Sequence, residues 1–294
     1  MPGRAEGGEA ATLMYYGRGK KRMCSKWIAA MKPLWALLVS FCLLAGTTSA
    51  EQYSVDLELV IAVDVSYSME IDEQHLQRQG YVDAFRRPEI AEALQRGPLG
   101  RIAVTYIEWG GSAVQIVPWT LIDGRATAAQ FSDALRRRPI RRISFTSISN
   151  ALVFARKLFQ TSPFRGTRRV IDVSGDGPNN AGVPAPVGRN TTVAQGIVID
   201  GLPIMLKTTP DSASIPDLDV YYRECVIGGD GAFLLKVTNV SQFAETILRK
   251  LVIEISGLEV SGTPQRQTSP VRVQYPRPYN CFIGEEMQER SIGK

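Results

Sequence analysis

The feature that most constrains the fold is an alternation of short apolar, β-branched segments with segments of helical spacing. Residues 57–63 are all apolar except Glu58, which is typical of a buried strand. Residues 71–85 then follow with helical spacing. The same alternation continues to residue 255. It predicts strands at residues 57–63, 102–109, 114–119, 170–173, 202–206 and 232–237, and helices at residues 71–85, 127–138, 148–159, 193–199 and 240–255.

The connections between these segments indicate how the strands are arranged. Strands that alternate with helices pair in parallel, because each helix carries the chain back across the sheet. Gly110 and Gly111 separate two strands with no helix between them, which favours a hairpin, and Pro118 suits an edge strand. We therefore expect an α/β fold: a doubly wound, mostly parallel six-stranded sheet with one antiparallel edge strand.

Residues 1–50 have the order of a secretory signal peptide. A basic stretch precedes an apolar run at residues 33–45, and small residues lead up to Ala50, where we expect cleavage. The alternative is a membrane anchor, but a 13-residue helix spans only about 20 Å of a hydrocarbon core of about 30 Å. The sequence thus predicts an exported protein, periplasmic or secreted, with no stable membrane span after cleavage.

The net charge of +5 comes from this leader. Residues 1–50 hold seven Lys or Arg against two acidic residues, so the rest of the chain has equal numbers of basic and acidic residues. A balanced chain does not have the electrostatic footprint of a nucleic-acid-binding protein. We expect no nucleic-acid partner.

Two segments follow the leader. Residues 51–256 hold the strand and helix pattern of one domain, whereas residues 257–294 lose that periodicity, accumulate prolines and are expected to form a tail. Cys225 and Cys281 remain after cleavage, and an exported protein allows them either to pair or to stay as free thiols. The sequence leaves both possibilities open.

Oxygen-bearing side chains lie after two of the predicted strands and before one of the predicted helices. Asp64, Ser66 and Ser68 directly follow the first strand, Thr146 precedes a helix, and Asp176 follows the strand at residues 170–173. Open α/β sheets bind their ligands at the carboxyl ends of the strands. The alternative interpretation is that these residues only cap helices and shape turns.

Together these five residues resemble the metal-ion-dependent adhesion site (MIDAS) of the von Willebrand factor A domain. The resemblance covers roughly residues 55–256, including the order of the elements. The segments at residues 221–229 and 243–251 are also similar to an exported bacterial family of unknown function that has this fold.

The resemblance implies a bound Mg²⁺ or Mn²⁺. It assigns Ser66, Ser68 and Thr146 as direct or near-direct ligands, and Asp64 and Asp176 as residues that hold waters and orient the hydroxyl groups. Hydroxyl ligands leave the charge of the cation poorly neutralised, so a carboxylate of a protein partner can bind there. The resemblance therefore implies metal-dependent adhesion to an unidentified acidic partner, without catalysis.

Enzyme classes with similar folds lack their residues in this chain. A haloacid dehalogenase-type phosphatase needs a second aspartate where Ser66 stands, and a serine hydrolase has only His75 as a candidate base. We expect no enzyme. The alternative function is a periplasmic solute-binding protein, or a structural α/β scaffold without a functional metal site.

Overall fold

The computed structural model describes residues 52–207, 214–258 and 278–293. The expected signal peptide at residues 1–50 lies outside these residues. Within the described part of the chain, no helix is both long and apolar enough to cross a bilayer.

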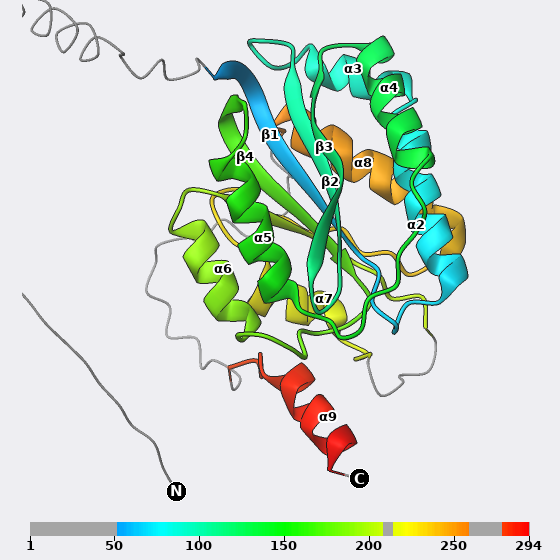
Figure 1. The fold of residues 1–294 in the computed structure, drawn as a ribbon, viewed down its shortest axis with the longest axis vertical. Helices are drawn as coiled ribbons and strands as arrows, with labels where there is room; N and C mark the ends of the chain where they lie inside the picture. The colour runs from blue at the N-terminus through cyan, green and yellow to red at the C-terminus, as the bar shows by residue number, and fades with distance from the viewer. Residues whose placement is uncertain (1–51, 208–213, 259–277, 294) are drawn as a thin grey trace, which may run out of the picture. The chain divides into compact units, whose positions relative to one another are not determined.

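The core of the fold is a five-stranded sheet in the order β3-β2-β1-β4-β5. Strands β1, β2, β4 and β5 are parallel, and β3 pairs with β2 in the antiparallel direction at one edge (Figure 1). This confirms the predicted fold class, including the antiparallel edge strand. The strands are β1 (Tyr53–Asp64), β2 (Ile102–Trp109), β3 (Ala113–Ile122), β4 (Phe164–Gly175) and β5 (Val198–Pro203).

The expected sixth strand, residues 232–237, does not form a continuous ladder. It meets β5 and the residue after it through two isolated parallel bridges, Gly201 with Leu234 and Ile204 with Val237. Pro203 lies between the bridged positions and has no N–H group to donate to a ladder, although its carbonyl accepts from Val237 N–H at 3.0 Å. The six-strand prediction is therefore wrong by this one segment.

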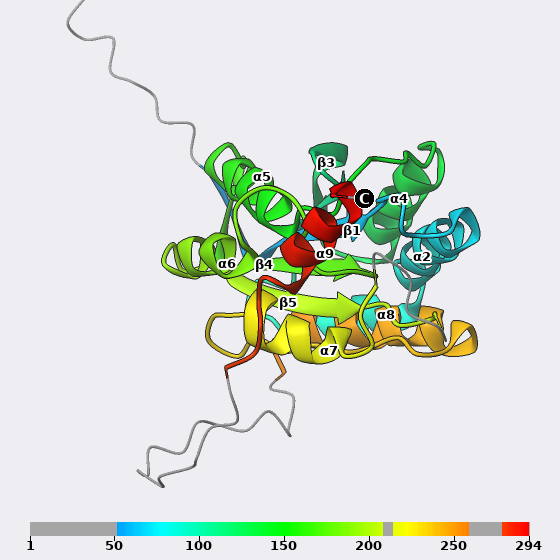
Figure 2. The ribbon, with the colours of Figure 1, turned by 90° about the horizontal axis from the view of Figure 1, so that it is seen from below.

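Helices pack against both faces of the sheet. Side chains of β1 alternate between the faces, with Leu59 and Ile61 in one core and Val60 and Ala62 in the other. Figures 1 and 2 show the two helical layers on either side of the strands. The first core holds α2 (Ile71–Ala84), α3 (Pro88–Leu94), α4 (Arg125–Arg136) and α8 (Phe243–Ser256); the second holds α5 (Ile148–Gln160), α6 (Ala185–Val193), α7 (Leu218–Tyr221) and the π-helical turn Tyr222–Val226.

One predicted helix is misplaced, and the short helices α3 and α7 and a helix in the expected tail were not predicted. Residues 193–199 do not form a helix: α6 ends at Val193, Gly196 turns the chain with φ 70°, and β5 begins at Val198. The apolar spacing there belongs to a turn followed by a strand. Helix α3 begins at Pro88 and was missed because its seven residues, about two turns, carry too little periodicity.

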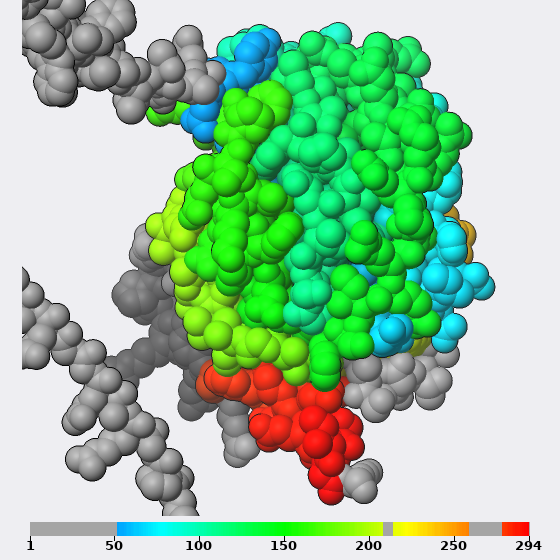
Figure 3. Space-filling model, in the orientation of Figure 1, coloured from blue at the N-terminus to red at the C-terminus, as the bar shows by residue number. Residues whose placement is uncertain are grey.

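The described residues of the expected tail include a helix, α9 (Ile283–Ile292). A disulfide between Cys225 and Cys281 ties the segment before α9 to the domain, which resolves the alternative that the sequence left open. Gly284 packs on the loop after β4 so closely that a Cβ atom would lie 2.1 Å from the carbonyl oxygen of Asn179. Glu285 accepts a hydrogen bond from Asn179 Nδ2 at 2.8 Å. Helix α9 is thus held at the carboxyl-end edge of the sheet (Figure 3).

Candidate metal centre

The five predicted residues lie on three loops at the carboxyl ends of the strands. Asp64 is the last residue of β1, and Ser66 and Ser68 follow it in the loop that leads to α2. Asp176 directly follows β4, and Thr146 lies two residues before α5. Because β1 and β4 are neighbouring parallel strands, their carboxyl ends bring the first and last members of this set together.

Four of the five residues form one continuous chain of hydrogen bonds. Asp64 Oδ1 accepts from the backbone N–H of Ser66 at 2.7 Å. The hydroxyl oxygens of Ser66 and Ser68 are 2.7 Å apart, and Ser68 Oγ donates to Asp176 Oδ1 at 2.7 Å. Ser68 is half-buried, whereas the other three residues are buried. The site is therefore reached from the side of Ser68.

Thr146 joins this set through its backbone. Its N–H donates to Asn180 Oδ1 at 2.8 Å, and its carbonyl accepts from the Asn180 N–H at 2.8 Å, which ties its loop to the loop of Asp176. The N–H of Ile143 donates to the carbonyl of Val65 at 3.0 Å. The loop of Thr146 thus lies against both other loops. The Thr146 side chain is buried, and its hydroxyl group makes no hydrogen bond within the part of the chain that the structure describes.

The residue before Thr146 has an unfavourable backbone conformation. Phe145 has φ 63°, in the left-handed region that costs a residue with a Cβ atom about 1–2 kcal/mol. Its side chain is 53% exposed, so burial does not compensate for this cost. Strain of this kind is typical of functional loops. The strained residue, Phe145, lies directly before the candidate ligand Thr146.

The carboxyl group of Asp64 is fully buried and only partly satisfied. Among the described residues, its Oδ2 atom has no hydrogen-bond partner, and neither has the buried hydroxyl group of Tyr222. Burial, and then the charge of Asp176, raise the pKa of Asp64 well above its usual range. Burial and then the charge of Asp64 likewise raise the pKa of Tyr222. A buried carboxylate of this kind is stabilised by a cation or a bound water.

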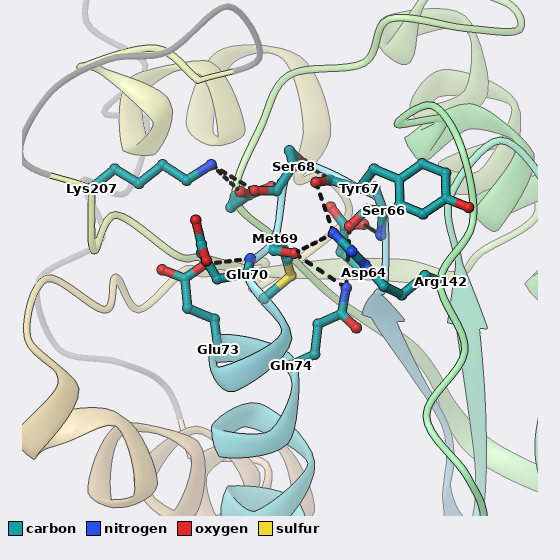
Figure 4. Close-up of polar contacts among 11 residues, drawn as sticks. Asp64, Ser66, Tyr67, Ser68, Met69, Glu70, Glu73, Gln74, Arg142 and Lys207 are labelled. Carbon is teal, nitrogen blue, oxygen red and sulfur yellow. Dashed lines mark hydrogen bonds and ion pairs between the residues drawn. The ribbon is translucent and has the colours of Figure 1, made fainter.

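The start of helix α2 supports the loop. Glu70 and Glu73 form a capping box, in which the Glu70 N–H donates to the Glu73 carboxylate at 3.0 Å. Gln74 donates to the carbonyl of Ser66 at 3.2 Å (Figure 4). Burial, followed by a smaller contribution from the charge of Asp176, raises the pKa of Glu73. These contacts fix the loop that carries both serines.

Two basic residues at the site were not predicted as part of it. Lys207 donates to the carbonyl of Ser68 at 2.7 Å and lies 3.0 Å from Asp176 Oδ2. Arg142 donates to the carbonyl of Tyr67 at 3.2 Å and lies over its ring, 4.8 Å from the centroid (Figure 4). Only their positions in the sequence could have indicated these two residues. Lys207 follows β5 at the same edge of the sheet, and Arg142 closely precedes Thr146.

The distances between the oxygen atoms fit an octahedral divalent cation. Ligands at about 2.05 Å from Mg²⁺ that occupy neighbouring octahedral positions are about 2.9 Å apart. The spacings from Ser66 Oγ to Ser68 Oγ and from Ser68 Oγ to Asp176 Oδ1 are both 2.7 Å. Within the described residues, no group of three or more His, Cys, Asp or Glu side chains is suited to a metal, so a site here would depend on hydroxyl oxygens.

Residues 54–259 match the family described as "Protein of unknown function (DUF1194)". The chain belongs to this family. The chain has a von Willebrand factor A-like fold, with the sheet order β3-β2-β1-β4-β5 and an antiparallel edge strand. No curated protein sequence matches the chain.

Several solved structures are similar to the chain at low sequence identity. Proximal thread matrix protein 1 from the mussel byssus (crystal form 2) has a TM-score of 0.51 and 14% identity, over 70% of this chain and 49% of that one. The same mussel protein, described with a zinc occupied MIDAS motif, has a TM-score of 0.48 and 13% identity, over 70% and 49%. A von Willebrand factor type A protein from Catenulispora acidiphila has a TM-score of 0.48 and 15% identity, over 70% and 44%. The chain spans about half the length of these proteins.

Proposed function

We propose that this protein is an exported, non-enzymatic binding domain that holds Mg²⁺ or Mn²⁺ and docks a carboxylate of a protein partner. Ser66, Ser68 and Thr146 would hold the ion, and Asp64 and Asp176 would hold waters and orient the hydroxyl groups. When bound, the ion would supply a coordination position for a carboxylate oxygen from outside the chain.

One observation carries this proposal. The three oxygen atoms Ser66 Oγ, Ser68 Oγ and Asp176 Oδ1 lie in a row with spacings of 2.7 Å, beside a fully buried carboxylate with an unpartnered oxygen. Turn formation and helix capping do not require Ser68 to meet Asp176, which is 108 positions away in the sequence. The von Willebrand factor A-like fold of the chain supports the same interpretation.

The surroundings of the site support an acidic partner. Ser68 is the half-buried, accessible member of the set, and Tyr67 beside it is 57% exposed. Arg142 and Lys207 place positive charge at the rim. Opposite charges across an interface increase the rate of association and the specificity of binding.

Calorimetric titration of chelator-treated protein with Mg²⁺ tests the proposal. The protein should bind one ion in the range up to millimolar, and Asp176→Ala should abolish binding. The matched control is Asp219→Ala, because Asp219 also pairs with a lysine, Lys236, at 2.9 Å. Chelator-sensitive capture of a partner from envelope extract should be lost in the first variant and kept in the second. Equal Mg²⁺ binding by both variants would exclude this site.

A further inference from the structure

The amino group of Lys207 makes two contacts with the candidate metal site. It donates to the carbonyl oxygen of Ser68 at 2.7 Å and to Asp176 Oδ2 at 3.0 Å. The other oxygen of the same carboxylate, Oδ1, accepts from the hydroxyl group of Ser68. Asp176 therefore faces the hydroxyl group of Ser68 with one oxygen and the ammonium group of Lys207 with the other.

The backbone places Lys207 at this position. Just before it, the N–H of Ile204 donates to the carbonyl of Gly175 at 2.9 Å, and the N–H of Met205 donates to the carbonyl of Val237 at 2.7 Å. Lys207 and Asp176 both line a cavity of about 250 Å³, and the side chain of Lys207 is 20% exposed. The ammonium group is thus held beside the site by a side chain that is only partly exposed.

A fixed positive charge beside a divalent cation has two opposite effects. It repels the cation and lowers the affinity of the site for the metal. It also adds positive charge to the loaded site and so attracts an incoming carboxylate. Asp64, Glu70, Glu73 and Arg142 also contribute to the local field, but they are unchanged when Lys207 alone is substituted. Replacing Lys207 with a neutral residue therefore isolates one unit of charge.

We propose that Lys207 adjusts this site for docking rather than for metal retention: its ammonium group weakens binding of the divalent cation and strengthens binding of the partner's carboxylate. The inference rests on the proposed function, because it concerns the same metal and the same docked group. It predicts that a single substitution changes the two affinities in opposite directions.

The first measurement is Mn²⁺ binding by the purified protein, followed by the electron paramagnetic resonance signal of the free ion. Lys207→Met and Lys207→Gln should each bind Mn²⁺ about tenfold more tightly than the unaltered protein. Lys207→Arg retains the charge and should stay within about twofold. The matched control is Lys236→Met, which removes an exposed lysine that pairs with Asp219.

The second measurement uses acetate as a carboxylate probe. With every protein saturated with Mn²⁺, the paramagnetic relaxation of ¹³C-labelled acetate reports how much acetate lies beside the ion. Relaxation should fall several-fold in Lys207→Met and Lys207→Gln and be unchanged in Lys207→Arg and Lys236→Met. Higher salt should reduce the difference between the variants, because the effect is electrostatic.

The outcomes separate this inference from the proposed function. An unaltered protein that binds no Mn²⁺ at millimolar concentration contradicts the proposed function. The role of Lys207 is overturned, and the proposed function is not, if the unaltered protein binds Mn²⁺ but the two neutral variants bind it no more tightly. The same holds if acetate relaxation is undiminished in the two neutral variants. Circular dichroism of each variant shows that it is folded, and the two neutral variants must agree.

Discussion

Gly175 faces the carboxyl group of Asp64 so closely that a Cβ atom at Gly175 would lie 2.8 Å from Asp64 Oδ2. The same Cβ atom would lie 3.0 Å from the hydroxyl oxygen of Tyr222. Both of these oxygen atoms are buried without a hydrogen-bond partner. The last residue of β4 therefore has to be small for the buried carboxyl group to keep its position.

We expect Gly175→Ala to reduce the affinity for Mg²⁺ at least tenfold while the protein remains folded. The added methyl group would displace the Asp64 carboxyl group and with it the loop that carries Ser66. Titration calorimetry measures the effect. Gly124→Ala is the control, because a Cβ atom at Gly124 would meet no atom within 4 Å. Unchanged Mg²⁺ affinity in Gly175→Ala would show that the position of Asp64 does not matter for metal binding.

The left-handed conformation of Phe145 predicts an unusual response to glycine. Replacing an exposed phenylalanine with glycine normally costs stability, because glycine has more conformational freedom when unfolded. At Phe145, with φ 63°, relief of strain should offset that cost. Phe282 is equally exposed, at 53%, but has φ −100°. In urea unfolding, Phe145→Gly should therefore be about 1 kcal/mol more stable than Phe282→Gly. Equal stabilities would argue against strain in the loop of Thr146.

A buried charge cluster between the sheet and α8 predicts how stability depends on pH. Lys250 pairs with Asp172 at 2.6 Å and with Glu254, and all three are buried. Asp200 also lies in this cluster, where burial raises its pKa to about 6 against the opposing charge of Lys250. Burial, and then the charge of Asp172, raise the pKa of Glu254 as well. The cluster therefore holds protons that the unfolded chain has already lost.

Between about pH 4 and pH 6 the folded protein should hold more protons than the unfolded chain, so the free energy of unfolding should fall as the pH rises through this window. Asp200→Asn should reduce this fall and be more stable than the unaltered protein at pH 7 by roughly 3 kcal/mol. Its amide oxygen can still accept from the Phe233 N–H, as Asp200 Oδ1 does at 3.0 Å. Urea unfolding at a series of pH values measures this. Asp72→Asn, at an exposed position, is the control, and parallel curves for both variants would contradict the prediction.

Reduction of the disulfide should release α9 from the domain. Cys225 and Cys281 are 56 positions apart, so their bridge should contribute roughly 4 kcal/mol in the chain-entropy model. A reducing agent should lower the melting temperature and remove hydrogen-exchange protection from the amides of α9, whereas α8 should remain protected. Equal protection of α9 with and without the reducing agent would mean that its contacts, such as Gly284 on Asn179, suffice to hold it.

The parts of the fold that were predictable from sequence are those with strong periodicity. Strand β2 has the predicted bounds, residues 102–109, because it is apolar on both faces and ends at a glycine pair. Helix α5 extends one residue beyond its prediction, to Gln160. Residues 193–203 were misassigned because an apolar helix end, a glycine turn and a short strand follow one another too closely for periodicity to separate them.

The part of the candidate site that was predictable from sequence is the part that lies at the ends of strands. The Asp-x-Ser-x-Ser pattern and Asp176 follow neighbouring parallel strands, so their proximity follows from the topology. Lys207 was not predictable in this way, because one lysine after a strand has no distinctive pattern. Whether Cys225 pairs with Cys281 was open for a similar reason: pairing depends on where the chain beyond α8 returns, and prolines, not periodicity, characterise that segment.

Diffraction from a crystal soaked in Mn²⁺, measured with anomalous scattering, tests the central claim most directly. The account predicts one anomalous peak at about 2.1–2.2 Å from the hydroxyl oxygens of Ser66 and Ser68, slightly longer than the distances typical of Mg²⁺. The account would be contradicted by a fully soaked crystal that shows no peak between these hydroxyl groups and Asp176. In such a crystal Ser68 would still donate its hydrogen bond to the Asp176 carboxylate.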